Sequence, residues 1–172
     1  ARLLDSTLPI PAPVQLFRST PGPLLSHFIG HEGHGSLFSC LKQRGWANLL
    51  SAGQAISAAG FELFKINIDL TNEGYEHYQD VVAAVFQYLD MLRAKPIEEW
   101  MYEEVRRLSE LRFVFKEKSS PAMYSSSLAS QMQHPLPPAW IMSGPYVFRE
   151  FAAPLVSSTL EYRRRESCRL ML

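Results

Sequence analysis

The stretch "FKINIDL" at residues 64–70 decides the fold class of this chain. Its side chains alternate strictly between apolar and polar, with Phe64, Ile66, Ile68 and Leu70 set against Lys65, Asn67 and Asp69. Successive side chains of a strand point to opposite faces of a sheet, so this alternation predicts a strand with one buried face. The segment 46–57 upstream, followed by Gly60, predicts a partner strand. The connection between them is too short for a crossover, so the pair should be antiparallel.

Helical patterns lie on both sides of this hairpin. Thr71 is a candidate N-cap, and the apolar residues after it recur at helical spacing as far as Pro96. A second apolar stripe with the same spacing runs over residues 97–115. Upstream, residues 24–43 also carry helical spacing, although the glycines among them weaken the helix. We therefore expect an α+β fold in which an antiparallel sheet carries helices layered on one face.

The two ends of the chain carry weaker signals. Residues 7–14, "TLPIPAPV", are too rich in proline for a central strand, so we expect an edge strand or an extended lead-in over residues 1–23. The serine- and proline-rich sequence after Lys118 predicts two shorter helices, at residues 123–132 and 145–151. The chain begins with alanine and ends on "CRLML", which is typical of a strand being entered. We interpret residues 1–172 as a single, truncated domain.

Composition excludes several classes of partner. The 47% of hydrophobic residues are enough to bury a core. Seventeen basic and seventeen acidic residues balance, so no global field draws the chain to nucleic acid or to an anionic membrane. No apolar run approaches the roughly 18 residues of a membrane-spanning helix. The two cysteines and the lack of a signal peptide indicate free thiols in a reducing compartment, which predicts a cytoplasmic location.

The segment "SHFIGHEGHGS" at residues 26–36 has the histidine content of a metal site. His27 and His31 stand four residues apart, as in the inverted zinc motif His-x-x-Glu-His, but Gly30 occupies the place of the catalytic glutamate. Losing a general base typically removes about 100- to 10,000-fold of rate. On a continuing helix Glu32 would point about 100° away from His31, so it is a poor substitute. We therefore expect no catalytic residue and no metal in this chain.

Several segments together resemble the insulin-degrading enzyme family, also called insulysin, and in particular its fungal pheromone-processing branch. They are "SHFIGHEGHGSLFSCLKQRGWANLLSAGQ", "INIDLTNEGYEHYQDVV", "VFQYLDMLR", "EEWMYEEVRRLSELRFVFKEKS" and "PLPPAWIMSG", within a resemblance that runs from about Thr7 to Leu172. In that family two homologous α+β domains form each half of a clamshell, and only the first carries the zinc site. This sequence resembles the second domain, so the resemblance places the zinc cofactor in a domain that this chain lacks.

The resemblance also implies a substrate-binding exosite, which anchors the amino terminus of peptides. Matching its motif points to a set of substrate-binding residues: His27, Gly30, Glu32, Leu50, Ala52, Gly53 and Gln54. Small residues let a substrate backbone approach, a strand edge can pair with it, and a carboxylate can hold the terminal ammonium. Three positions depart from the family pattern, namely Ser26 for glycine, His34 for proline and Ala52 for glycine.

The leading hypothesis is a noncatalytic, substrate-anchoring domain of a zinc metalloendopeptidase that degrades or processes short peptides. Its partners would be the peptide substrate and the neighbouring domains of the parent protease, and the family also allows a mitochondrial or peroxisomal location. One alternative is a truncated stand-alone peptide-binding or scaffold protein without protease activity. Another is an active zinc enzyme that joins His27 and His31 to a distant carboxylate such as Glu103 or Glu104, although it lacks the base.

Overall fold

The computed structural model describes residues 2–11, 21–58, 61–95, 97–133, 136–144, 147–161 and 165–172. They fall into two units, which we call unit 1 and unit 2. Unit 1 comprises the described parts of residues 1–12, 21–97 and 153–172, and unit 2 those of residues 98–152. The single domain expected from the sequence stays a prediction. Gly60, Pro96 and Pro145, which entered the expectations above, lie outside the described residues.

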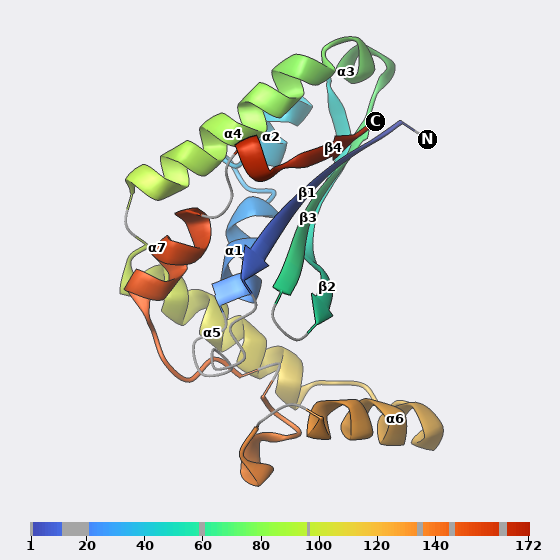
Figure 1. The fold of residues 1–172 in the computed structure, drawn as a ribbon, viewed down its shortest axis with the longest axis vertical. Coiled ribbons are helices and arrows are strands. Elements are labelled where there is room, and N and C mark those ends of the chain that lie inside the picture. The colour runs from blue at the N-terminus through green and yellow to red at the C-terminus, as the bar shows by residue number, and fades with distance from the viewer. Residues whose placement is uncertain are drawn as a thin grey trace. The chain divides into compact units, whose positions relative to one another are not determined.

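Unit 1 is built on a four-stranded antiparallel sheet with the order β2-β3-β1-β4 (Figure 1). The strands are β1 (Leu3–Pro11), β2 (Ala47–Ala58), β3 (Phe61–Leu70) and β4 (Arg169–Met171). The strand predicted at residues 64–70 and its antiparallel partner are confirmed as β3 and β2. The strand indicated by the last residues of the sequence is confirmed as β4.

The edge position expected for the first strand is wrong, because β1 lies between β3 and β4. The prolines are tolerated because β4 pairs only with Asp5–Thr7. Pro9 and Pro11 lie beyond that stretch, where the described sheet offers β1 a neighbour on the β3 side alone. Because proline has no backbone N–H to donate to a second neighbour, it is tolerated where β1 pairs on one side only.

Helices cover one face of this sheet, as the sequence predicts. They are α1 (Pro21–Ile29), α2 (Leu37–Gln43) and α4 (Tyr78–Ala94), while α7 (Ala153–Glu161) packs against α1 and α4 (Figure 1). The core lies between α1, α2, α4 and the sheet, and the apolar face of β3 is at most 3% exposed at Phe64, Ile66, Ile68 and Leu70. This confirms the α+β class with helices layered on one face.

The helix expected after Thr71 is interrupted. Thr71 is confirmed as an N-cap, since its hydroxyl accepts the N–H of Gly74 at 2.9 Å, but α3 (Asn72–Glu76) ends after five residues. His77 separates it from α4. The His77 ring stacks on Trp46 with 5.1 Å between ring centroids, so this corner ties the start of β2 to the start of α4.

Unit 2 contains α5 (Glu99–Val114), α6 (Pro121–Met132) and the short 3-10 turn η2 (Pro138–Trp140), and its aromatic core joins Tyr102 to Phe148 and Phe151. The second predicted stripe and the helix at 123–132 are confirmed as α5 and α6. The helix predicted at 145–151 is wrong, because residues 147–152 are not helical. Helix α7 begins only at Ala153, with Pro154 in its first turn, where proline is favoured.

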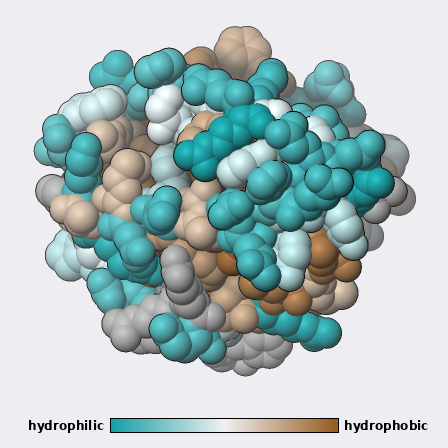
Figure 2. Space-filling model, turned by 90° about the horizontal axis from the view of Figure 1, so that it is seen from above, coloured by the Kyte–Doolittle hydropathy of each residue, from teal (hydrophilic) through white to brown (hydrophobic). Residues whose placement is uncertain are grey.

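No helix within the described part of the chain is both long and apolar enough to cross a bilayer. Figure 2 shows a surface on which hydrophilic residues alternate with smaller hydrophobic areas.

Candidate functional site

The candidate site lies where the end of α1 meets the edge strand β2. Among the described residues β2 pairs with β3 on one side only, so it is an edge strand whose other side has no strand partner in the described sheet. Helix α1 packs against this strand. The two sequence segments that carry the predicted exosite residues are thereby brought together.

Two glycines lie at this junction, and a side chain would be crowded at one of them, Gly30. A Cβ built on Gly30 would lie 2.9 Å from the carbonyl oxygen of Ser26 and 3.8 Å from the amide nitrogen of Ala52. A Cβ on Gly53 would lie 3.7 Å from Oγ of Ser26. Ser26 is held in turn by a 2.9 Å hydrogen bond from its hydroxyl to the carbonyl of Gly22. The junction is therefore lined by backbone and small side chains, with Ser26 at its centre.

The predicted site residues on β2 differ in accessibility. Leu50 is 3% exposed, and its side chain belongs to the core. Ala52 and Gly53 are half-buried, and Gln54 is exposed. A ligand could therefore meet the backbone of Leu50 but not its side chain, whereas Gln54 can offer its amide directly.

Helix α1 ends earlier than the continuous helix considered for Glu32. Its last residue is Ile29, and the N–H of Gly30 donates to the carbonyl of Ser26 at 2.9 Å. Glu32 therefore lies in the loop between α1 and α2 and not on a helix. Its carboxylate is exposed, and no described residue forms a hydrogen bond or ion pair with it. It can accept a cation from outside the chain.

The two histidines of the degenerate motif lie close together, but the hydrogen bonding of His31 does not suit a metal ligand. The ring centroids of His27 and His31 lie 5.8 Å apart in an edge-to-face arrangement. The N–H of Gly33 donates to Nδ1 of His31 at 3.0 Å, which in the neutral ring leaves the proton on Nε2. A protonated nitrogen cannot bind a metal. The hydrogen bond from Gly33 instead makes His31 close a turn in this loop. These residues do not fit a catalytic zinc ion.

The described residues also contain no group of three or more His, Cys, Asp or Glu side chains placed to hold a metal. That the chain binds no zinc nevertheless stays a prediction.

Sequence reasoning did not identify Ser36, whose buried hydroxyl accepts the N–H of Ser39 at 3.1 Å and caps α2. A serine directly before an apolar helical run is the signal that could have revealed it.

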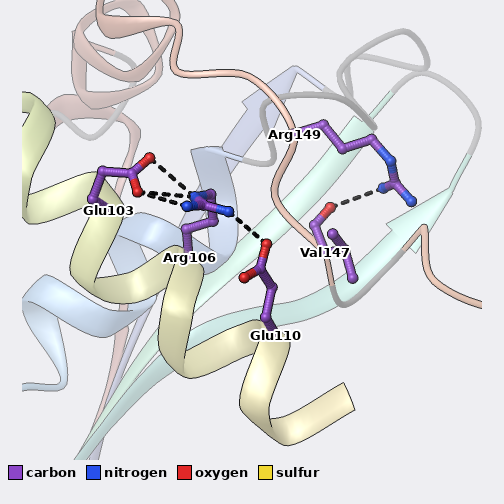
Figure 3. Close-up of polar contacts among 5 residues, drawn as sticks. All are labelled: Glu103, Arg106, Glu110, Val147 and Arg149. Carbon is purple, nitrogen blue, oxygen red and sulfur yellow. Dashed lines mark hydrogen bonds and ion pairs between the residues drawn. The ribbon is translucent and has the colours of Figure 1, made fainter. Parts of the chain in front are cut away.

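The two carboxylates considered for an alternative zinc site do not belong to the same unit as the histidines. Glu103 and Glu104 belong to unit 2, whereas His27 and His31 belong to unit 1. Arg106 binds Glu103 through two nitrogens at 2.7–3.1 Å and Glu110 at 2.6 Å (Figure 3). The hydrogen bond from Arg106 holds the pKa of Glu103 below its ordinary value. Glu103 is thus engaged within its own helix.

Comparisons with known proteins point to one family of peptidases. Residues 7–109 match the family described as the peptidase M16 inactive domain, and residues 113–172 match the middle or third domain of peptidase M16. The insulin-degrading enzyme of Homo sapiens is 40% identical over 156 residues, which cover 91% of this chain and 15% of that protein. The A-factor-processing enzyme of Saccharomyces cerevisiae is 41% identical over 130 residues, which cover 76% of this chain and 13% of that protein. These identities do not separate the fungal branch from the animal enzymes.

Solved structures show the same fold. Pitrilysin superimposes with a TM-score of 0.93 and 24% identity, over 98% of this chain and 18% of that one. The inactive peptidase domain of a putative zinc protease from Bordetella parapertussis gives a TM-score of 0.72 with 13% identity, over 98% of this chain and 88% of that one. The chain spans about 15% of the length of the curated relatives. Because the inactive-domain match covers more than half of the residues, the chain belongs to the M16 peptidase family, as an inactive domain of its insulysin-like zinc peptidases.

Proposed function

We propose that this chain is the substrate-anchoring, noncatalytic part of a zinc metallopeptidase that degrades or processes peptides. The printed names of its relatives, insulin-degrading enzyme and A-factor-processing enzyme, support a peptide as the substrate. The catalytic zinc would belong to the remainder of the parent protein, since the chain spans only about 15% of those relatives. Neighbouring domains of that protein are therefore its structural partners.

The observation that carries this proposal is the junction of α1 with the edge of β2. An extended peptide can add to a free strand edge through main-chain hydrogen bonds. Gly30 and Gly53 keep side chains out of this junction, so a peptide backbone can come close. Glu32 follows two residues after Gly30 in the loop that leaves this junction, and its exposed carboxylate could pair with the terminal ammonium of the peptide.

The first test compares two peptides on the full-length parent protein. A peptide with a free amino terminus should bind about tenfold more tightly than its acetylated twin, the low end for a charged hydrogen bond, because Glu32 is exposed and its pairing is screened. Glu32→Gln should remove this preference. Glu76→Gln, which neutralises another exposed carboxylate of unit 1, is the matched control and should leave the preference intact. Equal binding of both peptides to the wild type refutes the anchoring role of Glu32.

A second test concerns the strand edge itself. Gly53→Ala places a methyl at ordinary contact distance, 3.7 Å, from Ser26 Oγ, so the fold should tolerate it. The same methyl would narrow the space between β2 and Ser26, where we propose that the peptide backbone approaches the strand. We expect weaker binding of free and acetylated peptides alike, without a change in melting temperature. Unchanged affinity would show that peptides do not use this part of β2, whereas a retained tenfold preference would still assign Glu32 its role.

A further inference from the structure

Arg149 in unit 2 is an arginine held in a defined position without an acidic partner. Its guanidinium carbon lies 4.2 Å from the centre of the Trp140 ring. One terminal nitrogen, Nη1, donates to the carbonyl of Val147 at 2.9 Å (Figure 3), and the other, Nη2, donates to Oγ of Ser143 at 2.6 Å. The guanidinium is thus supported on one face and fixed at both terminal nitrogens.

The counter-charge is missing within unit 2. All seven acidic side chains of residues 98–152 lie within the described residues, and none of them forms an ion pair with Arg149. Arg106, in the same unit, shows the usual arrangement, because it binds the carboxylates of Glu103 and Glu110. In Figure 3 the Arg149 guanidinium points away from that trio. Its partial burial lowers its pKa, and no carboxylate opposes this effect.

The remaining donors of Arg149 suit a planar oxyanion. A guanidinium has five N–H groups, and two of those of Arg149 are used by Val147 and Ser143. The others lie in one plane, a geometry that matches the two oxygens of a carboxylate. Stacking on Trp140 fixes that plane, so little rotamer freedom remains to be lost when a ligand binds.

We propose that Arg149, stacked on Trp140 and braced by Ser143, binds a carboxylate of a peptide ligand, either its carboxyl terminus or an acidic side chain. The peptide as ligand rests on the proposed function. This site differs from the one proposed for Glu32, because it would bind a negative charge and its residues belong to unit 2.

The experiment measures peptide binding to the full-length parent protein by fluorescence anisotropy, with mass spectrometry to verify that the peptide stays intact. One labelled peptide is prepared as a free acid, as a carboxyl-terminal amide, and with its glutamates replaced by glutamines. We expect the wild type to prefer the free acid or the glutamate form about tenfold over its neutral counterpart. Arg149→Gln should erase the preference, and Arg149→Lys, which keeps the charge but loses the fork, should retain only part of it.

Two controls keep the test decisive. Arg107→Gln removes one exposed positive charge from the same unit and should leave the preference unchanged. The comparison of charged and neutral peptides on the wild type needs no variant, so it stands even if Arg149→Gln fails to fold. Equal binding of all three peptides to the wild type overturns the proposal. A preference that persists in Arg149→Gln also overturns the proposal. If acetate competes for the site but the wild type shows no preference among the peptides, the carboxylate does not come from a peptide. None of these outcomes depends on acetylation or on Glu32, so failure here is distinguishable from failure of the amino-terminal anchor.

Discussion

The replacement Gly74→Ala should strongly destabilise unit 1, because α3 lies directly against the backbone at the start of β2. A Cβ on Gly74 would lie 1.9 Å from the carbonyl oxygen of Trp46 and 2.7 Å from its carbonyl carbon. Both contacts are with backbone atoms, so no side-chain rotation can relieve them. Helix α3 and β2 would have to separate.

The contacts that such a separation breaks set the magnitude. The N–H of Thr71 donates to the Trp46 carbonyl at 3.1 Å, and the Thr71 hydroxyl donates to the Gly45 carbonyl at 2.6 Å. Each hydrogen bond contributes about 1 kcal/mol net, and the stacking of His77 on Trp46 adds about 1 kcal/mol. Displacing the Thr71 cap costs about 1 kcal/mol more, while alanine regains about 1 kcal/mol of helix propensity. We expect a loss of about 3 kcal/mol, or roughly 6–12 °C in melting temperature for a chain of this size.

The assay is thermal unfolding of the 172-residue chain followed by circular dichroism. Gly22→Ala is the matched control, since its Cβ would lie 3.3 Å from Oε1 of Glu62, the end of a flexible side chain. That variant should melt at the wild-type temperature or slightly above it, because alanine favours the helix. If Gly74→Ala melts within about 2 °C of the wild type, α3 is not seated on Trp46 and the assigned packing is incorrect.

Two further predictions concern metal and pH. The purified chain should retain no stoichiometric zinc after dialysis without chelator, and Gly30→Glu should not create a site; one tightly held zinc ion in either protein, detected by metal analysis, contradicts our account of the histidines. Because the native pKa of Glu103 lies below its ordinary value, its pairing with Arg106 stabilises the fold above the ordinary glutamate pKa and is lost as pH falls through the lowered native pKa. Melting curves should therefore show Glu103→Gln below the wild type at neutral pH and equal to it under strongly acidic conditions. A difference that persists there argues against the charge interaction.

The sequence predicts those parts of the fold that depend on local periodicity. The alternation in residues 64–70 identifies β3, and the residue spacing identifies α4 and α5, because one buried face leaves a regular pattern. The place of β1 inside the sheet depends on its pairing with residues 169–171, far along the chain, and no local pattern reveals this. The helix predicted at residues 145–151 is wrong for a similar reason. Phe148 and Phe151 pack on Tyr102, and a contact so far along the chain leaves no local pattern in the sequence.

The candidate site was only partly visible in the sequence. The residue types at positions 30, 32, 53 and 54 follow from the family resemblance, and their accessibility is compatible with binding. The burial of Leu50 and the approach of Gly30 to Ala52 depend on how α1 packs against β2, which neither segment encodes alone. Arg149 passed unnoticed because an arginine without an acidic partner is recognisable only once every carboxylate has been located.

The structure explains why a single substitution should not turn the histidine segment back into a zinc site. In the inverted motif the glutamate lies on the same helix as both histidines, but here α1 ends at Ile29, so position 30 only closes its last turn and His31 lies beyond the helix. Any side chain there would begin 2.9 Å from the Ser26 carbonyl. His31 is committed to the Gly33 N–H through Nδ1, and restoring a ligand would require that turn to open. The same three features shape the loop that carries the exposed Glu32, two residues after Gly30. A change that rebuilt the helix for zinc would therefore remove the loop that we propose holds the amino terminus of a peptide.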